Sequence, residues 1–144
     1  MKNKAMRILL LGCVLLIAAC GSDSLPPLVA TDVEITATMP GGKMSAGYLS
    51  LRNNSENAIS ITRVTSPEFE AVEIHSSFIE DGISKMRRSD ELTIAAGNTV
   101  TLQRGGLHLM LMRPTGSEND ISLNFYSEET FLLTVRTSIT PRGN

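Results

Sequence analysis

The 144-residue chain is predicted to be all-β, as a Greek-key sandwich or barrel of about nine or ten short strands. Short runs of alternating apolar and polar residues follow one another along most of the chain, and Gly, Pro, Asn or Asp residues separate them. No stretch has the apolar spacing of an amphipathic helix, and there is no internal repeat. With 42% hydrophobic residues, the chain can build the core of one domain, which we expect over residues 31–144.

The first half of the domain contains four of these runs. They end at turn-forming residues, which are Pro40-Gly41-Gly42, Asn53-Asn54 and Ser66-Pro67, and each turn limits the strand before it. The predicted strands are residues 33–35, 46–52, 58–64 and 69–75.

The second half continues the pattern. Glu80-Asp81-Gly82 predicts a hairpin turn that brings the next run back alongside residues 69–75. Gly105-Gly106 allows the backbone to bend just before a strand that ends at Pro114. The predicted strands are residues 83–87, 91–94, 99–103, 105–112, 121–127 and 131–138.

The N-terminus has the features of an export signal. Lys2, Lys4 and Arg7 precede an apolar segment, residues 8–18, that is too short to span a bilayer comfortably. Small residues before Cys20 resemble a bacterial lipobox, in which the cysteine is lipidated and becomes the new N-terminus. We expect residues 1–19 to be a lipoprotein signal peptide. An ordinary signal peptide with an incidental cysteine is the alternative.

The cysteine positions restrict the chemistry of the mature domain. Cys13 and Cys20 are the only cysteines, and both lie in the export segment. If Cys20 is acylated, the domain has no free thiol for a disulfide, a catalytic cysteine or a thiolate metal site. Residues 20–30 are polar and contain prolines, which predicts a lipidated tether that holds the domain to the membrane on its periplasmic side.

One predicted strand presents an unusual face. In Gly105-Gly106-Leu107-His108-Leu109-Met110-Leu111-Met112 the leucines share one side, which leaves His108, Met110 and Met112 on the other. Leucines on one side indicate the core. An imidazole and thioethers on the opposite side indicate a site for a soft metal.

A second pair of soft donors lies in the predicted hairpin. Val72 and Ile74 share the core face of residues 69–75, so His75 falls on the other face. Met86 has the opposite parity to Ile83, the apolar residue taken as the core marker of its run. If this hairpin lies beside the strand that carries His108 and Met110, the four side chains can converge, but the sequence does not show that adjacency.

A site made of two imidazoles and two thioethers favours Cu(I). Zinc sites use thiolate, imidazole and carboxylate, and calcium and magnesium require several oxygen ligands. A blue-copper centre requires a cysteine thiolate, which the mature domain lacks. We therefore expect one Cu(I) ion, held by His75, Met86, His108 and Met110, with Met112 beside the ligands. Met39 and Met44 flank the Gly41-Gly42 turn. Either could lie near the metal, but we expect both to pack in a loop or at the edge of the core.

The spacing H-x10-M-x21-H-x-M of these four residues resembles the PCuAC family of periplasmic copper chaperones. The resemblance extends to Ala46-Gly47-Tyr48-Leu49 and Lys85-Met86-Arg87, and covers essentially the whole mature domain. It implies a cupredoxin-like fold and delivery of copper to a partner, either subunit II of cytochrome c oxidase, with its CuA centre, or another assembly chaperone. This chain departs from many members in having Ser77 and Ser84 where they carry extra methionines.

Other classes of function fit less well. The net charge of −2 and the low aromatic content do not favour nucleic acid as a partner. No nucleophile elbow or metalloprotease motif accompanies the two histidines, so we expect no enzyme. A metal-free structural or adhesion lipoprotein would account for the fold and the tether but not for the placement of the methionines. We expect a monomer.

Overall fold

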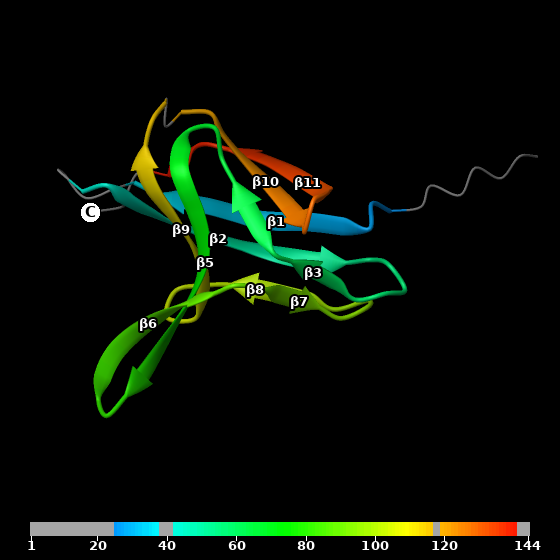
Figure 1. Ribbon diagram of the computed structural model, residues 1–144, viewed down its shortest axis with the longest axis horizontal. Coiled ribbons are helices and arrows are strands. Elements are labelled where there is room, and N and C mark those ends of the chain that lie inside the picture. The colour runs from blue at the N-terminus through cyan, green and yellow to red at the C-terminus, as the bar shows by residue number, and fades with distance from the viewer. Residues whose placement is uncertain (1–24, 38–41, 117–118, 141–144) are drawn as a thin grey trace, which may run out of the picture.

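A computed structural model describes residues 25–37, 42–116 and 119–140 (Figure 1). The predicted signal peptide, Cys20 and Met39 lie outside these residues. The described part folds into strands only, with no helix long and apolar enough to cross a membrane. The strands are β1 Leu28–Thr36, β2 Met44–Asn53, β3 Ile59–Ile61, β4 Arg63–Thr65, β5 Phe69–Glu80, β6 Ile83–Ser89, β7 Leu92–Ile94, β8 Thr99–Leu102, β9 Leu107–Pro114, β10 Ile121–Ser127, β11 Thr130–Thr137 and β12 Ile139–Thr140.

The predicted all-β class is confirmed. Most strands join one sheet in the order β11-β10-β4-β5-β9-β2-β1-β12, with β6 added beside β5 and β8 beside β2. Strands far apart in the sequence therefore lie side by side, and β9 lies between β5 and β2 as in Greek-key folds. The sheet bends so that β10 and β11 lie near β1 (Figure 1), while β3 and β7 form a second, two-stranded sheet.

The core lies on one face of these strands. Along β9, Leu109 and Leu111 are fully buried, and Val72 and Ile74 of β5 are buried on the same side. This agrees with the predicted alternation. Removing such side chains from water supplies the main stabilising free energy, at about 25 cal/mol per Å² of apolar surface.

The structure has twelve strands in its described part, more than the nine or ten predicted. The run 58–64 divides at Thr62, because β3 pairs with β7 in the small sheet whereas β4 pairs with β5 and β10 in the large one. The Thr62 amide donates to the carbonyl of Tyr126 at this change of partner. Strand β12, which pairs with β1 in parallel, was also not predicted.

The predicted limit between tether and domain needs a correction. Residues 28–30, assigned to the tether at 20–30, are the first three residues of β1 and pair with β2. Leu28 is only 3% exposed and belongs to the core, although Pro26-Pro27 before it gives the segment the composition of a linker. The domain therefore begins at Leu28 rather than at residue 31.

Strands β5 and β6 continue beyond the body of the domain. Strand β5 pairs with β9 only as far as Ser76, whereas its pairing with β6 continues to Glu80. Residues 77–86 therefore form a two-stranded extension, here called the arm, which projects from the rest of the sheet (Figure 1). Ile83, which the sequence pattern marks as a core residue, is 62% exposed, so that expectation is wrong: within the described residues no second layer covers the arm.

Candidate metal site

The register of three neighbouring strands brings the four predicted ligands onto one face. His75 of β5 lies directly opposite His108 of β9, and Met110 lies opposite Glu73. On the other edge of β5, Met86 of β6 lies opposite Ser77. Directly opposed residues in an antiparallel pair point to the same side of the sheet. The predicted adjacency of the hairpin and β9 is thus present, and the face is the one that the core residues avoid.

The two imidazoles are close to each other. Their ring centroids are 6.0 Å apart and the rings are tilted by 45°. His108 is only 4% exposed, and its Nδ1 donates a hydrogen bond of 3.0 Å to the carbonyl of Gly106. Gly105, with φ of 77°, makes the turn that brings this carbonyl back to the ring. Since Nδ1 carries the proton, Nε2 of His108 keeps a lone pair for a metal.

His75 is oriented by a carboxylate. Its Nε2 donates to Oε2 of Glu73 at 2.9 Å, and Arg88 donates to the other carboxylate oxygen of Glu73, also at 2.9 Å. In the neutral ring the lone pair of His75 is therefore on Nδ1, which is buried and has no hydrogen-bond partner among the residues that the structure describes. A buried polar atom without a partner is destabilising, and metal coordination would remove that cost. The donor chemistry of the site thus fits a soft metal ion.

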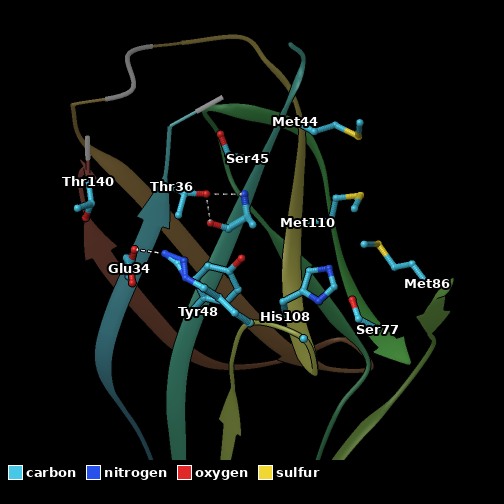
Figure 2. A pocket seen from close by; sticks show the side chains of 13 residues that line it. Glu34, Thr36, Met44, Ser45, Tyr48, Ser77, Met86, His108, Met110 and Thr140 are labelled. Atoms are coloured by element: carbon cyan, nitrogen blue, oxygen red, sulfur yellow. Dashed lines mark hydrogen bonds and ion pairs between the residues drawn. The ribbon is translucent and has the colours of Figure 1, made fainter. Parts of the chain in front are cut away.

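A cavity of about 560 Å³ opens onto this face (Figure 2). His108, Met110, Met86 and Met44 line one side of it, and Met86 is 51% exposed. His75 does not line this cavity but lies next to His108 on the neighbouring strand. The cavity therefore reaches His108 and the thioethers directly from the solvent side.

The opposite wall of the cavity is polar. Arg104 donates to Glu34 at 2.6 Å, and its guanidinium lies 4.7 Å from the ring centre of Tyr48. The hydrogen bond and the charge of Glu34 raise the pKa of Arg104, so its guanidinium keeps its positive charge. Within the described ranges, no cluster of three His, Cys, Asp or Glu side chains could hold a metal. Apart from Glu73, whose carboxylate is bonded to His75 and Arg88, the donors on this face are imidazole and thioether.

Comparison with protein families decides where the chain belongs. The family model described as "Putative lipoprotein LpqE-like" matches residues 28–135, most of the chain. The chain belongs to the LpqE-like family. Comparison with curated proteins finds no match for this LpqE-like chain.

Solved structures of PCuAC domains share the fold of the LpqE-like chain. The copper-bound PCuAC domain from PmoF2 has a TM-score of 0.65 and 16% identity, over 81% of this chain and 94% of that one. The solution structure of CuI-DR1885 from Deinococcus radiodurans is 28% identical, with a TM-score of 0.60, over 83% of this chain and 82% of that one. The predicted resemblance to the PCuAC family is confirmed.

For Met44 the sequence favoured packing in a loop or at the core edge over a place near the metal. This residue begins β2, is 57% exposed and lines the cavity together with Met86 and Met110, so the expected loop or core-edge packing is wrong. Its parity could have revealed this, because it is opposite to that of the buried Leu49 and Leu51 on the same strand. Met112 lies directly opposite Met44 but does not line the cavity of this LpqE-like chain.

Proposed function

We propose that the chain is a Cu(I) carrier of the cell envelope, which binds one ion and passes it to a partner protein. The buried, unpartnered Nδ1 of His75 is the observation that carries this proposal, because it lies beside a second imidazole and thioethers on one face. The copper-bound PCuAC domains of the same fold support the choice of metal. Thioether and imidazole donors together select Cu(I) over zinc, calcium and magnesium.

In this proposal each ligand has one donor atom. His75 binds through Nδ1 and His108 through Nε2, while Met86 and Met110 bind through sulfur. All four donors are neutral, so the bound ion keeps its positive charge and can leave by stepwise exchange with an acceptor's ligands. The proposed acceptor is the CuA centre in subunit II of cytochrome c oxidase, or another assembly chaperone. The role is that of a carrier, with no enzymatic step.

The proposed location is the periplasmic side of a membrane, with Cys20 as the lipid anchor after cleavage of residues 1–19. The lipoprotein description of the LpqE-like family supports this. Replacement of Cys20 by Ser should abolish incorporation of labelled palmitate and release the chain from the membrane fraction. Labelling that persists in Cys20→Ser would contradict the assignment, and Cys13→Ser is the matched control.

Copper binding can be tested directly by titration. The full chain carrying Cys13→Ser and Cys20→Ser, so that no thiol competes, is titrated with Cu(I) against a coloured chelator. We expect one equivalent to bind, and most of the affinity to be lost in His108→Ala and in Met110→Ala. Met112→Ala, on the same face of β9 but outside the cavity, is the control. Affinity that survives in the His108→Ala, Met110→Ala double variant would exclude this site.

Delivery is a separate question. Two equivalents of loaded protein, mixed with the copper-free, reduced soluble domain of oxidase subunit II, should fill its two-copper centre with Cu(I). Removal of one electron by added ferricyanide should then give the absorption bands of mixed-valence CuA. If the chain binds Cu(I) but the bands do not form, this acceptor is wrong and the site remains. A metal-free structural lipoprotein, the alternative function, would show neither binding nor transfer.

A further inference from the structure

The donors that line the cavity differ in one residue from the four predicted ligands. His75 is absent from the lining, and Met44, which neither the spacing pattern nor the family resemblance includes, is present. Figure 2 shows Met44, Met110 and Met86 on the same side of the cavity, with His108 below Met110. Three thioethers from three different strands therefore face one solvent-filled space.

The donor side chains become less exposed from the opening of the cavity toward its inner end. Met44 and Met86 are each more than half exposed, Met110 is half-buried, and His108 is almost completely buried. Methionine is an apolar residue that is more often buried than exposed, so two exposed methionines at the opening of one cavity call for a reason. An ion that enters from solvent meets the thioethers before it meets the imidazoles.

Register supports the position of Met44. It lies opposite Met112, and Ala46 lies opposite Met110, so Met44 is two residues further out on the same face. Along a strand this is about 7 Å, a distance that two flexible methionine side chains can bridge. Ala46, between Met44 and Tyr48 on this face, carries only a methyl group and leaves the space open.

We propose that Met44 is an additional Cu(I) donor at the outer end of the cavity, where it holds the ion together with Met86 and Met110. This inference rests on the proposed function and adds an outer position to the same site. The exchange involves no redox change: as the ion moves inward, its bond to the sulfur of Met44 breaks and bonds to the imidazole nitrogens form. Movement outward reverses these steps, so that an acceptor meets copper on exposed thioethers.

The outer position can be tested separately when His75, one of the two imidazole ligands of the inner position, is removed. In the chain with Cys13→Ser, Cys20→Ser and His75→Ala, we expect residual Cu(I) binding that depends on Met44. Adding Met44→Leu should weaken that binding about tenfold, which corresponds to about 1.4 kcal/mol. Adding Met112→Leu, the matched control across the strand pair, should leave it unchanged. With ¹³C-methyl methionine, the Met44 methyl resonance should shift on addition of Cu(I), and the Met112 resonance should not.

The outcomes separate this inference from the proposed function. If the chain with His75 intact does not bind Cu(I), the proposed function fails. If that chain binds but the His75→Ala variant binds nothing, or Met44→Leu has no more effect than Met112→Leu, only the outer position is excluded. Met44 would then be an exposed apolar residue at the rim. Leucine is close in volume to methionine and Met44 is exposed, so folding of this variant is not at issue.

Discussion

At the scale of single residues, the carboxylate of Glu73 orients the imidazole of His75 and pairs with Arg88. One carboxylate oxygen accepts from Nε2 of His75 and the other from Arg88, so the carboxylate fixes both the tautomer and the orientation of the ring. Its own side chain is only partly exposed, at 24%, which protects these bonds from competition with water. A ligand held in this way reaches the metal with its lone pair already aimed.

Glu73→Gln should therefore weaken Cu(I) binding by about 10- to 100-fold, as is common when the partner of a metal-binding histidine is changed. The amide can still bond to the ring, but it no longer pairs with Arg88 or enforces a proton on Nε2. A chelator competition titration measures the effect. Glu70→Gln is the control, because Glu70 lies on the same strand, is exposed and pairs with Arg113 away from the histidines. Equal affinities of the two variants would contradict the role of Glu73.

The sequence correctly predicted the direction of side chains where one face of a strand is covered by the core. Leu109 and Leu111 placed His108 and Met110 correctly, because a buried apolar face fixes parity. Ile83 predicted the wrong direction, because β6 has no side covered by the residues that the structure describes, and an exposed apolar residue does not show which face is buried. The unpartnered Nδ1 of His75 could not be predicted, because it depends on which ring nitrogen Glu73 engages.

At the scale of strands and turns, Gly47 of β2 has no side chain, which lets Ile35 and Leu109 pack closely against its backbone. A Cβ at this position would lie 2.9 Å from Cδ1 of Ile35 and 3.1 Å from Cβ of Leu109. The isoleucine methyl can move, but the Cβ of Leu109 is fixed by its own strand. Gly47 is flanked by Ala46 and Tyr48, which face the cavity, so a shift here would move its wall.

Gly47→Ala should lower the free energy of unfolding by about 1–3 kcal/mol, the usual cost of overpacking a core. Urea denaturation followed by circular dichroism measures this. Gly106→Ala is the matched control, because a Cβ there would meet its nearest neighbours at 3.7 Å, an ordinary contact. If the urea midpoint of Gly47→Ala equals or exceeds that of Gly106→Ala, the proposed overpacking at Gly47 is wrong.

Turns were the most predictable elements. The hairpin at residues 80–82 joins β5 and β6 as expected, and Gly105 lies in the turn before β9. Short runs were less predictable, because β3 and β4 read as one strand and separate only through their different partners. Local composition does not reveal a change of partner, since β7 and β10, which pair with β3 and β4, lie about 30 and 60 residues away in the chain.

At the scale of the whole molecule, Asn53 ties the two sheets together. It ends β2 and is completely buried. Its side-chain amide donates to the carbonyls of Asn57 and Ile94, at 2.7 and 3.0 Å, and its oxygen accepts from the backbone and side chain of Ser55. Ile94 is the last residue of β7, so these bonds join the small sheet to the large one.

Asn53→Ala should lower the free energy of unfolding by about 2–4 kcal/mol, because it leaves several buried groups without partners. Thermal and urea unfolding measure the loss. Asn98→Ala, at an exposed position, should change stability little. If both variants unfold alike, the two sheets do not depend on this side chain.

The adjacency of β5, β6 and β9 could not be obtained from the sequence alone. The hairpin turn predicts the pairing of β5 with β6, but β9 is about 30 residues away and its place between β5 and β2 depends on the packing of the whole sheet. The resemblance to a known family predicted the convergence that periodicity could not. Met44 was the less favoured candidate, because it has no place in that family's spacing pattern.

The arm has one further consequence. In the part of the chain that the structure describes, β6 pairs only with β5, so its outer edge offers free backbone groups to any passing strand. Lys85, Arg87 and Arg88 lie on this strand, and like charges on two such edges repel each other. Edge-to-edge addition of such strands from many copies would build fibres. Lys85 and Arg88 are partly neutralised by Glu80 and Glu73, and we expect the remaining positive charge of this edge to disfavour pairing between copies.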